Sequence, residues 1–254
     1  MSSKRKELAG NGRAKRPFLS SEGKAFRKRL VSALCGFLSG ALILASLYWG
    51  LSASEDATVF VTDTASHGEG SVCTRNVDWQ ALPDSVVAWV SVPGTAIDSP
   101  VAQAASDAPN AFLKVDALGQ GSYGTPYLDW ECNIESPFAV VYGHHMSDGS
   151  VFADFASFSD RAFAEEHARI HVCKRDAECA ELQVIAADVV NANRQRITTS
   201  FPTEDEREAY LEKAIMTSDM VCREREEGAQ TFAFVTCSYQ TRNSRTVVYA
   251  IAKD

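Results

Sequence analysis

A cysteine and an arginine stand at the facing ends of two strand-like runs near the end of the chain. Cys237 ends the run that begins at Thr231, and Arg245 opens the run that continues to Ala252, with seven polar or turn-forming residues, 238–244, between them. If the runs pair as an antiparallel hairpin, the thiol and the guanidinium are close neighbours. Such a positive charge favours thiolate over thiol and stabilises the oxyanion formed when a carbonyl is attacked. Alone, the pair is a weak signal, because a cysteine at a strand end is more often a packed small residue and an arginine that begins a strand is more often a solvated edge charge.

A histidine after another apolar run supplies the partner that a cysteine nucleophile needs. Residues 140–146 read Val-Val-Tyr-Gly-His-His-Met, so His144 stands where an apolar strand ends. A nucleophilic cysteine requires a base or an imidazolium group that is near in space but not necessarily in sequence. The pattern therefore predicts His144 as the acid/base partner of Cys237.

These motifs carry a resemblance to a known family. Tyr-Gly-His-x-Met at 142–146, followed by a Gly and a Phe, and then Thr-Cys at 236–237 with an Arg eight residues on, resemble the sortases, particularly class B. Residues 86–101, 110–113 and 124–129 also resemble family segments. The likeness covers about residues 80–254.

The resemblance implies a cysteine transpeptidase on a β-barrel of about eight strands. Cys237 would attack the Thr carbonyl of a surface protein's sorting signal and form a thioester, which a peptidoglycan amine would then resolve. His144 would protonate the leaving amine and deprotonate the incoming one, and Arg245 would hold the substrate backbone and the oxyanion. His145 matches a variable neighbour of the catalytic histidine. No cofactor is implied.

Substrate contacts are also implied by the resemblance. Asn110 and Tyr142 match groove positions, although a turn asparagine and a barrel-packing tyrosine are equally consistent with the residues. Val235 and Thr236 precede the nucleophile and are assigned to substrate binding as well. Class B members often carry Ser where Val235 stands, which leaves the preferred sorting motif open.

The N-terminal region predicts a membrane anchor. Residues 1–29 hold ten Lys or Arg and two acids, and residues 30–51 hold no ionisable acid or base. A helix of that length spans roughly 30 Å of hydrocarbon. The basic flank predicts a cytoplasmic N-terminus and an extracellular remainder. The alternative is a cleaved secretory signal, for which Ser-Ala-Ser at 52–54 would be the cleavage site.

The remaining chain is predicted to be an irregular stalk, 52–76, and a mainly β catalytic domain, 77–254. Strand-like runs occupy 87–92, 138–142, 170–173, 182–190, 231–236 and 246–252. The Thr-x-x-Glu capping box at 203–206 predicts a helix over about 204–217 that buries Tyr210, Leu211, Ala214 and Ile215. A shorter helix is expected after Ser159 with Phe163 inward. The overall expectation is a closed sortase-type barrel with an N-terminal transmembrane helix.

Cysteine and histidine positions allow further predictions. Cys173 and Cys179 bracket a polar turn, so either a disulfide across a hairpin or two free thiols is expected. The histidine pairs 144/145 and 167/171 lack the further ligands of a metal site, and no metal is predicted. After residue 29 the chain holds 15 basic and 31 acidic side chains, which argues against nucleic acid as a partner.

Three alternative functions stay open. A hydrolytic cysteine protease would share the acyl-enzyme and differ only in using water as acceptor. A pilus-polymerising class C sortase is disfavoured because 52–76 contains no proline and the chain ends at Asp254, directly after the last strand-like run. An exported binding module would retain the barrel without needing Cys237. The surface protein that is anchored and the acceptor amine are not indicated by the sequence.

Overall fold

The computed structural model describes residues 61–63, 75–117, 123–193, 195, 197–238 and 243–252. The chain divides into residues 1–53 and 54–254, and all described residues belong to the second part. The predicted cytoplasmic segment, the predicted anchor and Cys73 therefore lie outside the described residues. Within the described ranges, no helix has both the length and the apolar character that a membrane crossing requires.

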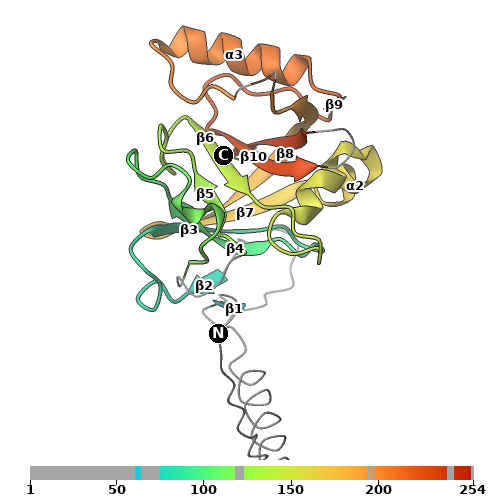
Figure 1. Cartoon of the computed structure of the whole chain (residues 1–254). Helices are drawn as coiled ribbons and strands as arrows, with labels where there is room; N and C mark the ends of the chain where they lie inside the picture. Colours follow the sequence, from blue (N-terminus) through green and yellow to red (C-terminus); the bar gives the residue numbers. More distant parts are fainter. Residues whose placement is uncertain are drawn as a thin grey trace, which may run out of the picture. The chain divides into compact units, whose positions relative to one another are not determined.

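Eight strands close into a barrel (Figure 1), as the sequence predicted. The sheet order is β11-β10-β6-β5-β4-β3-β7-β8, and a further pairing of β11 with β8 completes the ring. A two-residue strand, β9, pairs antiparallel with Ala186 and Ala187 of β8. The strands of the sheet are β3 (Val86–Ser91), β4 (Asp98–Gln103), β5 (Tyr127–Leu128), β6 (Phe138–Gly143), β7 (Arg169–Lys174), β8 (Cys179–Asn191), β9 (Met220–Val221), β10 (Thr231–Ser238) and β11 (Ser244–Ala252).

All six strand-like runs form strands, but the strands reach beyond the apolar runs. β8 begins at Cys179, and β10 and β11 include Ser238 and Ser244, so only 239–243 connect the last two strands. Backbone pairing continues into polar residues because it requires main-chain groups rather than apolar side chains. For the same reason the short strands β5 and β9 carry no signal of their own. A 3-10 helix, η3 (Ala153–Ser159), was likewise not predicted.

Aromatic side chains from η3 and the residue before it pack against the central strand β10. Phe152, Phe155 and Phe158 are fully buried, and the Phe155 ring stacks on the Phe234 ring with centroids 5.0 Å apart. The Phe152 ring meets the Phe155 ring edge-on at 4.7 Å. Aromatic pairs in these geometries add to the free energy of apolar burial. This cluster supports β10 from the face opposite Cys237, since side chains alternate along a strand.

The predicted capping box begins α3 (Glu204–Met216). The Glu206 N–H donates to the Thr203 hydroxyl at 3.2 Å, and Leu211 and Ile215 are buried. Tyr210 and Ala214 are partly buried against the same core. Figure 1 shows α3 across one end of the barrel. The helix prediction is confirmed.

The shorter predicted helix is α2 (Arg161–Glu166). Its N-cap is Asp160, which accepts from the Phe163 N–H at 3.0 Å, so the helix begins two residues after Ser159. The Phe163 ring packs inward between the rings of Phe158 and His167, at centroid distances of 5.3 and 4.4 Å.

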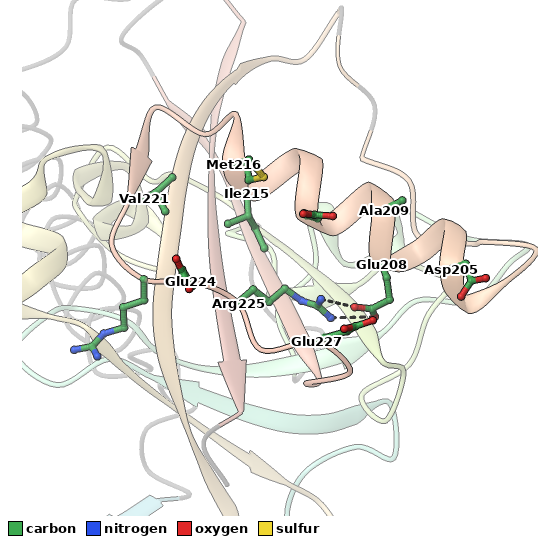
Figure 2. Close-up of a pocket in the computed structure, with 11 residues that line it drawn as sticks. Asp205, Glu208, Ala209, Ile215, Met216, Val221, Glu224, Arg225 and Glu227 are labelled. Atoms are coloured by element: carbon green, nitrogen blue, oxygen red, sulfur yellow. Dashed lines mark hydrogen bonds and ion pairs between the residues drawn. The ribbon is translucent and has the colours of Figure 1, made fainter.

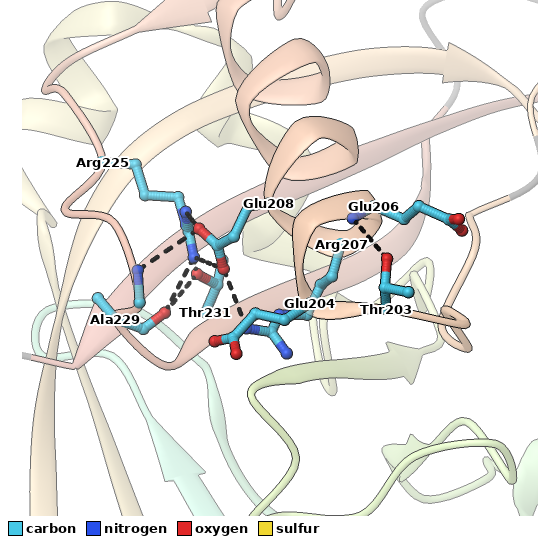
Figure 3. Close-up of polar contacts among 9 residues, drawn as sticks. Thr203, Glu204, Glu206, Arg207, Glu208, Arg225, Ala229 and Thr231 are labelled. Carbon is cyan, nitrogen blue, oxygen red and sulfur yellow. Dashed lines mark hydrogen bonds and ion pairs between the residues drawn. The ribbon is translucent and has the colours of Figure 1, made fainter.

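An ionic network ties α3 to the start of β10 (Figure 3). The Arg225 guanidinium donates to both Glu208 carboxylate oxygens, at 2.5 and 3.1 Å, and to the Thr231 hydroxyl at 2.9 Å. These hydrogen bonds, together with that from Arg207, lower the pKa of Glu208 to about 2. Since Thr231 opens β10, the helix and the strand that carries Cys237 share one polar anchor.

Two short strands occupy part of the range 52–76 that was predicted to be an irregular stalk, and the second ends one residue beyond it, at Val77. β1 (Val61–Asp63) pairs antiparallel with β2 (Arg75–Val77). Arg75 forms an ion pair with Asp98 of β4, and its guanidinium lies 5.9 Å from the Trp89 ring centroid. Trp89 donates to the same carboxylate at 2.5 Å. These contacts attach β2 to the barrel.

Of the two alternatives for Cys173 and Cys179, the structure contains the disulfide. Cys173 and Cys179 are register partners on β7 and β8 and are joined through sulfur. Among the other described cysteines, Cys132 is buried, Cys222 is half-buried and Cys237 is exposed, each with a free thiol. Burial raises the pKa of the Cys132 thiol to about 11, which suits a packed rather than a reactive sulfur.

Candidate active site

Antiparallel pairing of β10 with β11 brings together the first two predicted site residues. Cys237 is the register partner of Arg245, so both side chains extend from the same face of the sheet. Cys237 is exposed and Arg245 is half-buried. The neighbourhood of thiol and guanidinium that the hairpin predicted is therefore observed.

Parallel pairing of β6 with β10 brings His144 to the same edge. The last register pair is Gly143 with Thr236, so His144 and Cys237 are the next residues on two neighbouring strands that run in the same direction. Side-chain alternation then places both on the face opposite Thr236. A β-carbon at Gly143 would lie 2.2 Å from the Phe152 ring, which explains the need for glycine there.

The imidazoles of the two adjacent histidines have separate backbone partners. His144 Nε2 bonds to the Leu113 carbonyl oxygen, and His145 Nδ1 lies 2.9 Å from the Cys237 carbonyl oxygen. Because a carbonyl only accepts, each of these ring nitrogens carries a hydrogen. His145 thus contacts the main chain of Cys237, while the His144 ring is oriented from another loop.

Two tyrosines line the same face beside this edge. Tyr142 is the register partner of Tyr127, their ring centroids are 5.8 Å apart, and the Tyr127 hydroxyl donates to Asn110 Oδ1 at 3.3 Å. Burial raises the pKa of Tyr127 and, more strongly, that of Tyr142, so both phenols are neutral near pH 7. The Arg245 charge opposes the rise in both cases. Asn110 and Tyr142 therefore lie together with the predicted site.

Asp129 is a site residue that sequence reasoning missed. The Tyr142 hydroxyl donates to its carboxylate, and its charge adds to the raised pKa of both tyrosines. Asp129 stands just after β5, where an acidic turn residue is unremarkable, so nothing local in the sequence identified it.

Val235 and Thr236 are more deeply buried than Asn110 and Tyr142. Their side chains are 2% and 1% exposed, and Thr236 faces the interior beside Thr246, its register partner. Neither threonine hydroxyl has a hydrogen-bond partner among the described residues. A peptide beside Cys237 would reach only the main chain at these two positions.

The other two histidines in the described ranges, His167 and His171, have ordinary protein partners. His167 Nδ1 lies 3.0 Å from the Pro93 carbonyl oxygen, and His171 lies 3.7 Å from the Glu181 carboxylate. Within the described ranges, no three His, Cys, Asp or Glu side chains are grouped as a metal site would require.

A cavity of about 670 Å³ lies elsewhere, between α3 and residues 221–227 (Figure 2). Its lining combines carboxylates with the apolar side chains of Ile215, Met216 and Val221, and it includes the Glu208–Arg225 ion pair. None of His144, Cys237 or Arg245 lines it. The cysteine site is therefore distinct from this cavity.

Comparisons with known proteins agree with this geometry. The sortase domain model matches residues 90–253. Sortase B of Listeria monocytogenes is 27% identical over 160 residues, which cover 61% of this chain and 63% of that protein, so the match spans less than two thirds of the relative. Sortase B of Staphylococcus aureus is 22% identical over 178 residues, covering 67% of this chain and 71% of the relative.

Solved structures show the same fold. The structure of Clostridium perfringens sortase B matches with a TM-score of 0.63 and 24% identity, over 70% of this chain and 98% of that one. A Staphylococcus aureus sortase B–substrate complex matches with a TM-score of 0.61 and 20% identity, over 69% and 83%. The family model covers well over half of the chain. Its range includes β6, β10 and β11, the strands whose pairing brings the motifs at 142–146 and 236–245 together. The chain therefore belongs to the sortases, a family of cysteine transpeptidases, and its similarity is to class B.

Proposed function

We propose that this chain is a class B sortase that transfers an acyl group from a sorting-signal peptide to an amine, with Cys237 as nucleophile, His144 as acid/base and Arg245 as electrostatic clamp. The observation that carries the proposal is the double register of β10. Its antiparallel pairing with β11 makes Cys237 and Arg245 register partners, and its parallel pairing with β6 ends at Gly143 and Thr236, the residues just before His144 and Cys237.

The proposed reaction has two balanced steps. The Cys237 thiolate attacks the peptide carbonyl, the C–N bond breaks, and the departing amine takes a proton from His144, leaving a thioester. An incoming amine then attacks the thioester, loses its proton to His144 and releases the thiolate. Arg245, half-buried beside the sulfur, offsets the oxyanion charge in both tetrahedral intermediates.

Structures of relatives support the two kinds of partner. A sortase B has been solved as a substrate complex and another as a complex with triglycine. For this chain we propose a surface protein's sorting signal as donor and a peptidoglycan amine as acceptor. The neutral phenols of Tyr127 and Tyr142 and the amide of Asn110 would bind the peptide beside Cys237.

Turnover of a peptide library by the purified chain tests the assignment. We expect amide product when an amine such as triglycine is present, and loss of turnover in Cys237→Ala. Arg245→Ala should slow turnover on the order of 10²-fold, as loss of an oxyanion donor does. Cys222→Ala, which removes another accessible thiol, is the matched control and should retain activity. Full activity of Cys237→Ala would refute the nucleophile assignment.

The same assay separates a transpeptidase from a hydrolytic protease. Both form the thioester, but water as acceptor gives a peptide acid, whereas an amine gives a new amide. Mass spectrometry of products with and without triglycine distinguishes them. Acid product alone at saturating amine would favour the protease.

We further propose that residues 30–51 anchor the protein in the cell membrane of a Gram-positive bacterium, with residues 1–29 in the cytoplasm and the barrel facing the cell wall. The support is the uncharged stretch of twenty-two residues behind ten basic ones. Protease treatment of intact cells should degrade the barrel while an N-terminal tag is protected. Release of the whole barrel into the medium would instead indicate a cleaved signal.

A further inference from the structure

Gly124 adjoins the contact that orients the imidazole of His144. Gly124 is buried and has φ +75°, in the left-handed region. A β-carbon there would lie 2.6 Å from the Leu113 carbonyl oxygen, 2.8 Å from His144 Cδ2 and 2.9 Å from the Phe112 carbonyl oxygen. These separations are too short to exist. The space between the imidazole edge and the Leu113 carbonyl is therefore open only because residue 124 has no side chain.

Thr125 fixes the loop that presents this carbonyl. Its N–H donates to the Phe112 carbonyl at 2.9 Å and its hydroxyl to the Val115 carbonyl at 3.2 Å. Thr125 is 5% exposed, so both bonds are shielded from water. The carbonyl of Leu113, between these two, is the one that receives the His144 Nε2 hydrogen.

We propose that Gly124 and Thr125 are positioning residues for His144, acting through the Leu113 carbonyl. A carbonyl on Nε2–H fixes the tautomer, so Nδ1 is the nitrogen left to take up and release a proton. The inference rests on the proposed role of His144.

The same loop connects His144 to the peptide groove. The turn of η2 (Ala111–Leu113) starts at Asn110, whose side chain accepts from Tyr127, and ends at the residue that holds the imidazole. A peptide that contacts Asn110 would thus be positioned against the same rigid segment that orients the acid/base group.

The test compares two glycine-to-alanine substitutions that place alanine at nearly the same positive φ. Gly228 has φ +78° and no atom within 4 Å of an added β-carbon, so Gly228→Ala carries the strain of Gly124→Ala without the collision. His144 is observed by nitrogen NMR in the ¹⁵N-histidine-labelled full chain in micelles, with His144→Gln for assignment. The titratable neighbours His145, Cys237 and Arg245 are unchanged in both variants.

We expect the wild type and Gly228→Ala to show the Nε2–H tautomer of His144, and Gly124→Ala to lose it. Gly124→Ala should lower kcat by roughly 10-fold or more with KM changed little, as misplacement of a catalytic group does. An identical His144 tautomer in Gly124→Ala and Gly228→Ala would overturn the proposal.

Thr125 provides a second route if Gly124→Ala does not fold. Thr125→Val keeps the branched shape but removes the hydroxyl bond to the Val115 carbonyl, and should reduce the share of the Nε2–H tautomer of His144. Thr125→Ser keeps the hydroxyl and should retain the wild-type tautomer. The same tautomer in Thr125→Val and Thr125→Ser would count against the role of the loop. The NMR comparison needs no turnover. A wild type without transpeptidase activity would therefore refute the proposed function, while the NMR result on His144 could still be interpreted.

Discussion

Replacement of Glu208 by glutamine tests whether the ionic anchor of α3 stabilises the fold. The carboxylate accepts two bonds from Arg225, and the side chains of this pair are 16% and 8% exposed. The pKa of Glu208 falls from its ordinary 4.5 to about 2. Since one pKa unit is equivalent to about 1.4 kcal/mol, the drop corresponds to about 3 kcal/mol.

Some of that free energy is lost to solvent screening, because the network lies beside an open cavity. We therefore expect Glu208→Gln to lower the free energy of unfolding by about 2 kcal/mol at pH 7. Glutamine keeps the size of the side chain and removes only its charge. Glu212→Gln, on the exposed side of the same helix, is the control and should be neutral.

The contribution of Glu208 to the free energy of unfolding should depend on pH in the direction set by its lowered pKa. A depressed pKa stabilises the folded state fully above the unfolded value of 4.5, and the stabilisation is lost as the pH falls toward 2. At pH 3 roughly 40% of the pH 7 contribution should remain.

Urea unfolding followed by tryptophan fluorescence measures the difference between the two proteins. Hydrogen exchange of residues 204–231 shows whether the loss is local to α3 and the start of β10. A difference between wild type and Glu208→Gln that is the same at pH 7 and pH 3 would refute the electrostatic reasoning.

Three further perturbations have expected outcomes. Cys173→Ala removes the disulfide that closes the β7–β8 loop, whose cysteines are six residues apart, and should lower the free energy of unfolding in urea by about 2 kcal/mol. Added reductant should lower the free energy of unfolding of the wild type but not that of the variant. Gly143→Ala forces a β-carbon against the Phe152 ring and should cost about 1–3 kcal/mol, which an unchanged urea midpoint would contradict. Arg75→Met removes the ion pair with Asp98 and should speed hydrogen exchange in β1 and β2 at least 10-fold while peptide turnover is unaffected; protection equal to the wild type would show that the pair does not hold these strands.

Features that depend on residues close together in the sequence could be predicted from the sequence. The Cys237–Arg245 contact follows from a hairpin, because two apolar runs joined by a short polar segment have few other ways to pair. The capping box predicted α3, and the spacing of Cys173 and Cys179 allowed the disulfide, for the same local reason. The placement of His144 was predicted from the order of motifs shared with the sortases rather than from periodicity.

Features that depend on distant segments were decided by the tertiary structure. The parallel pairing of β6 with β10 joins segments about ninety residues apart, and no local pattern specifies which strands become neighbours. Asp129 and the Leu113 carbonyl enter the site only through that closure, and Glu208 meets Arg225 only when α3 folds back onto the start of β10. The residue types of the proposed reaction can thus be identified from the sequence. Their orientation depends on main-chain groups, which every residue carries and which come into contact only when the barrel closes.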